Sequence, residues 1–220
     1  MNLRERLDSV RERMARAAAQ AGRNVDEITL VAVTKVFPAS AIREAYDLGL
    51  RDFGENYLQE FEDKHPHIAD LAGARFHLIG HLQSNKAKKA ASLFQTIQTL
   101  DTPKLARRLE ECATPLEVLL EVKLSEEESK KGAAPDQLAE LVETVRSCPH
   151  LNLRGLMTMP PWSEDAELSR PYFRRLRALA EQHGLMSLSM GMSHDLETAI
   201  EEGATHVRVG TALFGRRVKA

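Results

Sequence analysis

Eight short apolar or β-branched runs, separated by segments with helical periodicity, constrain the fold of this chain more than any other sequence feature. Runs of this length suit strands rather than helices. The predicted strands are residues 30–35, 51–54, 75–79, 94–99, 116–122, 153–157, 185–190 and 206–209. Strands that alternate with helices pair in parallel through right-handed crossovers, and eight repeats close a barrel. We therefore predict an α/β fold, a single (β/α)8 TIM barrel.

The chain length and the N-terminal segment refine this prediction. At 220 residues the chain leaves little room for elaborate insertions, because such barrels typically run to about 250 residues with a lower limit near 200. A doubly wound open sheet is the alternative, but no glycine-rich dinucleotide turn follows the first strand. Leu3, Leu7, Val10 and Met14 recur at steps of four and three, which predicts an amphipathic helix within residues 1–23. We expect one domain, residues 1–220, with this extra helix packed on the barrel.

Composition argues against binding to nucleic acid or membranes. The formal net charge is −2, and aromatic residues make up 5% of the chain, so stacking platforms for bases are scarce. Lys86, Lys88 and Lys89 follow one another closely, but three lysines on one helix are typical of a solvated face. No stretch approaches the roughly 18 to 20 apolar residues of a membrane span. We expect neither kind of partner.

The cysteines and histidines indicate no metal site. Cys112 and Cys148 are the two cysteines, and their spacing fits neither a metal site nor a disulfide framework. This usage suits a reducing compartment, so we expect a cytoplasmic protein. His77 and His81 have a ligand-like spacing, but that spacing brings two rings to one face only in a helix. Because they straddle a predicted strand end, we predict no metal site there.

The first predicted strand ends on a lysine, Lys35. In α/β barrels, ligands gather at the carboxyl ends of the strands. A lysine amine at the edge of a water-poor pocket has a lowered pKa and can form an imine with an aldehyde. Taken alone, this stretch also fits a lysine that only solvates a strand end.

The segments after the seventh and eighth predicted strands favour a phosphate site. Ser193 precedes one helical segment, and Gly210 and Thr211 open another. Exposed N–H groups at helix starts bind anions, and barrels often place a phosphate after strands seven and eight. Simple N-capping by Ser193 and Thr211 is the alternative. Strands one and eight are neighbours in a barrel, so a ligand with an aldehyde and a phosphate, such as pyridoxal 5′-phosphate (PLP), would bridge them. Arg208 is placed to reach its ring nitrogen.

Six motifs, in order along nearly the whole chain, resemble the pyridoxal phosphate homeostasis protein family, which is similar to the N-terminal barrel of alanine racemase (PLP fold type III). They are Thr34-Lys35, Phe53-Gly54-Glu55-Asn56, the run from His77 to Lys86, Gly155-Leu156-Met157-Thr158-Met159, Ser189-Met190-Gly191-Met192-Ser193 and Arg208-Val209-Gly210-Thr211. The resemblance implies a Schiff base between PLP and Lys35. It also implies that Ser193, Gly210 and Thr211 receive the phosphate and that Arg208 faces the pyridine nitrogen.

Three further positions match family positions that line the pocket: Asn56, His81 and Met157. Two positions depart from the family pattern. Phe76 stands where a tryptophan is usual, which keeps an aromatic ring, and Lys123 stands where an asparagine is usual. A lysine pointing inward would add a cation that repels a protonated pyridine. A lysine pointing outward toward residues 126–128 would be a surface charge.

The resemblance implies that the protein stores, buffers or delivers PLP in the cell without substantial turnover, so we do not expect an enzyme. An arginine beside the ring nitrogen disfavours the protonated pyridinium that makes the strongest electron sink. Racemases of this fold take a second base, a tyrosine, from another domain of a partner subunit, and we expect no such domain here. Tyr46, Tyr57 and Tyr172 lie in predicted helices. The alternative is a small PLP-dependent amino-acid racemase or lyase.

Partners other than PLP are less constrained by the sequence. PLP-dependent apoenzymes are the expected recipients of the cofactor. The acidic residues 126–128, followed by Lys130 and Lys131, are typical of a solvated loop, and a recognition loop for such an enzyme is the alternative. We expect a monomer, since the added domain that builds the racemase dimer is missing from the expected architecture.

Overall fold

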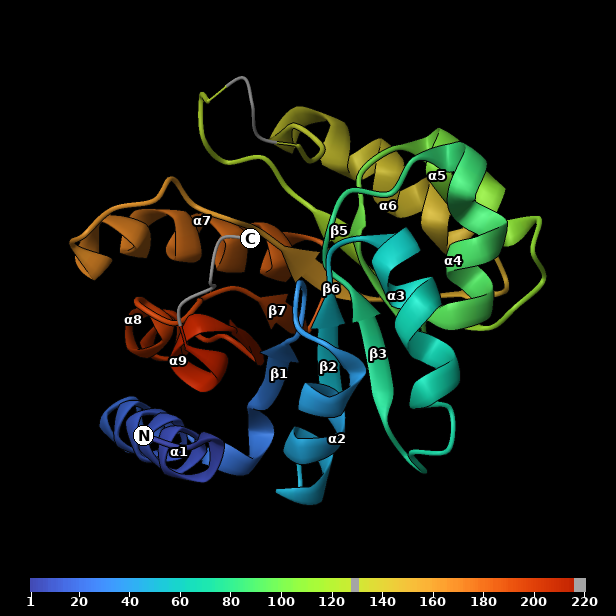
Figure 1. Ribbon diagram of the computed structural model, residues 1–220. Coiled ribbons are helices and arrows are strands. Elements are labelled where there is room, and N and C mark those ends of the chain that lie inside the picture. Colours follow the sequence, from blue (N-terminus) through green and yellow to red (C-terminus); the bar gives the residue numbers. More distant parts are fainter. Residues whose placement is uncertain (128–130, 216–220) are drawn as a thin grey trace.

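The computed structural model describes residues 1–127 and 131–215 of the chain. Its strands are all parallel and close a barrel in chain order, with β8 beside β1, which confirms the predicted TIM barrel (Figure 1). The strands are β1 (Thr29–Val33), β2 (Asp52–Glu55), β3 (Arg75–Leu78), β4 (Thr96–Leu100), β5 (Leu116–Glu121), β6 (Leu151–Met157), β7 (Ser187–Ser189) and β8 (His206–Val209).

Helices pack around the outside of this barrel (Figure 1). They are α1 (Leu3–Gln20), α2 (Ala39–Asp47), α3 (Leu58–Lys64), α4 (Ala87–Leu93), α5 (Pro103–Glu110), α6 (Leu138–Arg146), α7 (Arg170–Gln182), α8 (Leu196–Glu201) and α9 (Thr211–Phe214). Short 3₁₀ turns precede α4, α6 and α7. None of the described helices is both long and apolar enough to cross a membrane.

The N-terminal helix α1 packs on the outside of the barrel, against α8 and α9 (Figure 1). Its first turn is fixed by a capping box, in which the Asn2 side chain accepts the Glu5 N–H and the Glu5 carboxylate accepts the Asn2 N–H. The predicted apolar face is buried at every position named for it: Leu3, Leu7, Val10 and Met14. That residues 1–220 form one folding domain stays a prediction.

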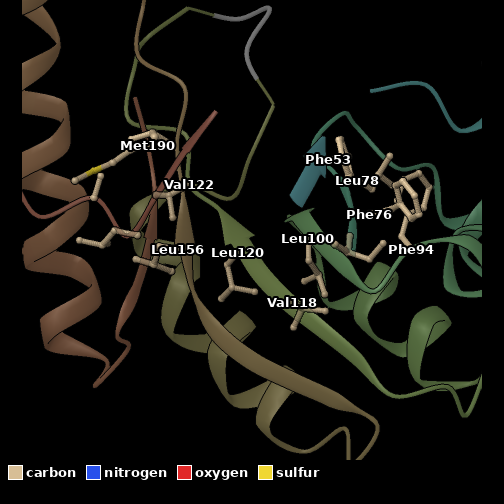
Figure 2. Close-up of a cluster of buried hydrophobic side chains, with 14 of the residues drawn as sticks. Phe53, Phe76, Leu78, Phe94, Leu100, Val118, Leu120, Val122, Leu156 and Met190 are labelled. Atoms are coloured by element: carbon tan, nitrogen blue, oxygen red, sulfur yellow. The ribbon is translucent and has the colours of Figure 1, made fainter. Parts of the chain in front are cut away.

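Apolar side chains fill the layer between the strands and the surrounding helices. Figure 2 shows Phe53, Phe76 and Phe94 gathered on one side of the barrel. Phe61 of α3 lies between two of these rings, with its ring centroid 4.9 Å from Phe76 and 4.6 Å from Phe94. Phe76, the aromatic residue noted at this position in the sequence, is therefore a core residue, and truncating such a ring typically costs about 3–5 kcal/mol.

One predicted boundary was wrong in a way that matters for the site. The helix predicted from about residue 55 begins at Leu58, because Glu55 ends β2 and Asn56 and Tyr57 connect the two elements. Tyr57 has extended backbone angles and a side chain that is largely exposed, so it lies ahead of α3 rather than within it.

Candidate functional site

A cavity of about 230 Å³ lies at the carboxyl ends of the barrel strands. The segments that follow β1, β2, β3, β6, β7 and β8 contribute to its lining. Six of the eight predicted site residues line it: Lys35, Asn56, Ser193, Arg208, Gly210 and Thr211. The barrel therefore brings together residues that are far apart in the sequence, as the order of its strands requires.

The other two predicted residues, His81 and Met157, do not line this cavity. His81 is 44% exposed, with its Nδ1 3.7 Å from Asp101 Oδ2, and lies in a neighbouring hollow that also includes Asn56. Met157 is fully buried at the end of β6, whereas Met159, two residues further on, lines the cavity. The proposed contact of either residue with a ligand stays a prediction, because a motif does not say which way a side chain turns.

Lys35 projects from a tight turn that follows β1. The Phe37 N–H donates to the Thr34 carbonyl at 3.0 Å, which closes the turn, and the Lys35 side chain is half-buried. Val36 has a φ of +63°, a conformation that a β-branched residue adopts only at a cost of about 1–2 kcal/mol. Contacts elsewhere must hold this turn in place, and one of them is the Glu60 carboxylate, which accepts the Val36 N–H.

Another part of the cavity wall is built from the segments after β7 and β8. Gly191 has a φ of +88°, and a Cβ there would come within 2.4 Å of the Ala199 Cβ, so the chain can turn toward Ser193 only with glycine. The Ser193 hydroxyl accepts the Ala212 N–H at 3.2 Å. Ser193 thus joins the two segments, while Asp195 is the N-cap of α8.

Arg208 lies at the base of the cavity and is almost fully buried. Its guanidinium donates to Ser189 Oγ at 2.6 Å and to the Thr158 carbonyl at 2.9 Å. Burial lowers the Arg208 pKa to about 10, against the opposing charges of Asp195 and Glu121. Arg208 is therefore a fixed cation at neutral pH.

A line of polar side chains continues from Arg208 through the barrel interior. Ser189 Oγ donates to Gln98 Oε1 at 2.6 Å, and Gln98 Nε2 lies 3.1 Å from His77 Nδ1. His77 Nε2 lies 2.9 Å from Asp52 Oδ1. All of these side chains are buried, and each has a hydrogen-bond partner within the line. The sequence analysis did not predict this relay; the available signal was the presence of polar residues, Asp52, His77, Gln98 and Ser189, within predicted strands.

Aromatic side chains at the cavity also went unpredicted. Phe37 and Trp162 both line it, and the Trp162 ring lies 6.3 Å from that of His194, another lining residue. Trp162 is 70% exposed, so it stands at the mouth rather than inside. The Phe37 ring also lies 5.1 Å from that of Phe214 at the end of α9. The cavity thus has a polar base and an aromatic rim.

Two other sequence expectations concern residues outside the cavity. Lys123 is half-buried and is absent from the cavity lining, so among the described residues Arg208 and Lys35 are the cations that the cavity presents. Residues 128 and 130, which belong to the charged segment considered as a recognition loop, lie outside the described residues. Within residues 1–127 and 131–215, no three His, Cys, Asp or Glu side chains are arranged to hold a metal ion.

Comparison with known proteins agrees with this architecture. Residues 6–218 match the family described as alanine racemase, N-terminal domain. A pyridoxal phosphate homeostasis protein of Pseudomonas aeruginosa is 48% identical over 97% of this chain and 95% of its own. The protein of the same name in Aquifex aeolicus is 44% identical over 99% of both chains.

Solved structures extend the comparison to the fold. PipY of Synechococcus elongatus, determined with PLP bound, is 37% identical and superimposes with a TM-score of 0.85 over 97% of this chain and 100% of that one. Alanine racemase of Corynebacterium glutamicum, at 19% identity, shares the fold alone, with a TM-score of 0.68 over 96% of this chain and 61% of that one. The chain therefore belongs to the pyridoxal phosphate homeostasis protein family.

Proposed function

We propose that this protein binds PLP, holds it as a Schiff base on Lys35, and serves PLP homeostasis by storing, buffering or delivering it without substantial turnover. One observation carries the proposal: Lys35, Arg208 and the segment containing Gly210 and Thr211 line a single cavity. The names of the relatives and the PLP bound to PipY support the same ligand.

The residues of the cavity fit three of the polar groups of PLP: the aldehyde, the phosphate and the ring nitrogen. The Lys35 amine suits the aldehyde, where its attack on the carbonyl carbon forms the C=N bond and releases the oxygen as water. The Ser193 and Thr211 hydroxyls, with the backbone around Gly210, suit the phosphate. The Arg208 guanidinium suits an unprotonated pyridine nitrogen, because it carries hydrogen-bond donors only.

The same residues favour holding over turnover. PLP, when bound, supplies an electron sink for amino-acid chemistry. The permanent charge of Arg208 opposes a proton on the ring nitrogen and so weakens that sink. None of the three tyrosines lines the cavity: Tyr46 donates its hydroxyl to the Ala72 carbonyl, Tyr172 lies in α7, and Tyr57 faces the neighbouring hollow. A tyrosine base for the second face of the imine is thus absent from the cavity.

An absorbance spectrum tests the cofactor assignment. Protein incubated with PLP and freed of excess should show an imine band near ~420 nm that borohydride bleaches. Mass spectrometry should then find PLP fixed on the peptide that contains Lys35, and the Lys35→Ala variant should show neither signal. Wild type and variant that look alike, with no retained cofactor, would remove Lys35 from its role.

A chiral assay separates holding from the alternative, a small racemase or lyase. Pure protein loaded with PLP should leave L-amino acids unchanged, as measured by chiral chromatography. Robust turnover that disappears in Lys35→Ala would establish an enzyme instead. For partners, we propose PLP-dependent apoenzymes as recipients and a monomer of 24.6 kDa, which light scattering checks directly.

A further inference from the structure

A buried cluster of charged side chains lies behind the turn that carries Lys35. Its centre is Lys64, the last residue of α3, whose side chain is only 8% exposed. The Lys64 ammonium donates to the Thr34 carbonyl and to Glu55 Oε1, each at 2.9 Å. It also pairs with Glu60 Oε1 at 2.5 Å. None of the side chains of Glu55, Glu60 and Lys64 lines the cofactor cavity.

The cluster forms hydrogen bonds with the turn at the residues before and after Lys35. On the N-terminal side it holds Thr34 twice, through the carbonyl bonded to Lys64 and through the hydroxyl, which donates to Glu55 Oε1 at 2.7 Å. On the C-terminal side Glu60 accepts the N–H of Val36, the residue with the strained positive φ. The backbone of Lys35 is therefore fixed at both neighbouring residues by one connected group.

Electrostatics couple the members of the cluster tightly. Burial raises the pKa of Glu55, and the Lys64 charge opposes this rise. Glu55 Oε2 is buried without a hydrogen-bond partner among the described residues. The negative charge of the Glu55 carboxylate is therefore stabilised through the contacts of its other oxygen, Oε1. Removing one partner of such a buried pair leaves the other charge uncompensated. The arrangement thus behaves as a unit.

We propose that Glu60 and Lys64 are positioning residues for the cofactor lysine: they hold residues 34–37 in the conformation that directs the Lys35 amine into the cavity. The inference rests on the proposed function of Lys35 as the imine lysine. It assigns no contact with the cofactor to Glu60 or Lys64; both act through the backbone of the turn. Loss of the Glu60 carboxylate lets Val36 relax from its positive φ, which carries Lys35 away from the aldehyde.

The test compares two ligands that differ only at the aldehyde. Glu60→Ala should weaken binding of PLP by about tenfold. Binding of pyridoxine 5′-phosphate, which has a hydroxymethyl group in place of the aldehyde, should stay within about twofold of wild type, the range of a surface substitution. The matched control is Glu62→Ala. Glu62 lies in the same helix as Glu60, and its exposed carboxylate pairs with Lys89 of α4, so its removal should change neither affinity.

A second variant shows whether the effect passes through Val36. Glycine adopts a positive φ without strain, so in a Val36→Gly background the loss caused by Glu60→Ala should shrink to about twofold. Thermal unfolding of each apoprotein confirms that the variants fold. The Val36→Gly variant keeps the turn sterically allowed, so its PLP affinity can be measured even where Glu60→Ala is poorly stable.

Three outcomes would overturn the proposal. Equal losses for PLP and pyridoxine 5′-phosphate would mean a general collapse of the cavity. Equal PLP affinities for Glu60→Ala and Glu62→Ala would mean that the cluster has no role in positioning. A wild-type protein that binds pyridoxine 5′-phosphate but yields no borohydride-fixed Lys35 would instead refute the proposed function, and the positioning role with it.

Discussion

At the scale of single residues, Arg208 illustrates how a cation is kept away from water inside the barrel. Its two described hydrogen bonds end on Ser189 Oγ and the Thr158 carbonyl, and two carboxylates, Asp195 and Glu121, raise its pKa against the larger effect of burial. Hydrogen bonds to a charged group contribute about 1.5–3 kcal/mol each. The orientation of the guanidinium is therefore strongly determined before any ligand binds.

Ser189→Ala should destabilise the fold, because the change removes both the acceptor for Arg208 and the donor to Gln98. We expect the free energy of unfolding to fall by about 1–3 kcal/mol in urea titrations. Ser92→Ala is the control: Ser92 is exposed and its hydroxyl donates to the Lys89 carbonyl of its own helix, so the change should stay within about 0.5 kcal/mol. Equal stabilities for the two variants would contradict a structural role for the relay.

His206 should make the folded state sensitive to mild acid. Burial, followed by the nearby His77 charge, lowers its pKa from 6.5 to about 4. Between these values the unfolded chain binds a proton that the folded chain does not, so stability falls as the pH drops from about 6.5 to about 4. The loss amounts to about 3 kcal/mol, since one pKa unit is about 1.4 kcal/mol.

Unfolding measurements across this pH window check the assignment. His206→Gln should flatten the profile by most of that amount, because glutamine does not titrate. The exposed His67 provides the control, since His67→Gln should leave the slope unchanged. A His206→Gln variant that keeps the full acid sensitivity would assign the loss of stability to other groups instead.

At the scale of elements, helix α1 supports the segment after β7, although none of its own residues lines the cavity. Arg13 donates to the Ser193 carbonyl at 2.9 Å and forms a two-pronged pair with the Glu197 carboxylate. The pair lowers the pKa of Glu197, although burial opposes this effect. The loop after β7 is therefore fixed to α1 at the residue proposed to receive the phosphate.

Arg13→Ala should weaken PLP and pyridoxine 5′-phosphate alike, because both carry the phosphate. We expect a loss of about three- to tenfold for each in fluorescence or calorimetric titrations, as for a truncated, partly buried charged contact. Arg4→Ala, an exposed position on the same helix, should change neither affinity. Loss of PLP binding alone would contradict this division between the phosphate side and the amine side of the cavity.

The elements also show what the sequence could and could not predict. Number, order and approximate bounds of the strands followed from local patterns, because period and length are local properties. The start of α3 did not, since Glu55 is polar yet ends a strand, where its carboxylate meets Lys64 and Thr34 from other elements. Side-chain direction at Met157 and the relay through Gln98 depend on the packing of strands distant in the sequence, which no local pattern reports.

At the scale of the whole molecule, ligand binding and folding are linked. The cavity is lined by segments that follow β1, β2, β3, β6, β7 and β8, so a ligand bound there would contact residues spread from Val33 to Gly215. A ligand that binds only the folded state stabilises it by about 2.7 kcal/mol at a concentration of 100 Kd. The cofactor should therefore act as a folding constraint on the entire barrel.

PLP at 100 Kd should raise the melting temperature by roughly 5–10 °C, because about 1 kcal/mol corresponds to 2–4 °C in a domain of this size. Differential scanning calorimetry measures the shift. Pyridoxal, which lacks the phosphate, should give a much smaller shift at the same concentration, and Lys35→Ala should reduce the PLP shift. A PLP shift that is insensitive to both changes would place the stabilising ligand outside this cavity.

The position of Trp162 gives the molecule an intrinsic optical reporter. It is the single tryptophan of the chain, and it stands at the rim of the cavity beside His194. An imine chromophore seated there would accept excitation energy from this indole over a very short path and quench its emission. Emission would recover as the cofactor departs, so handover to an apoenzyme could be timed by stopped flow without any label on donor or recipient.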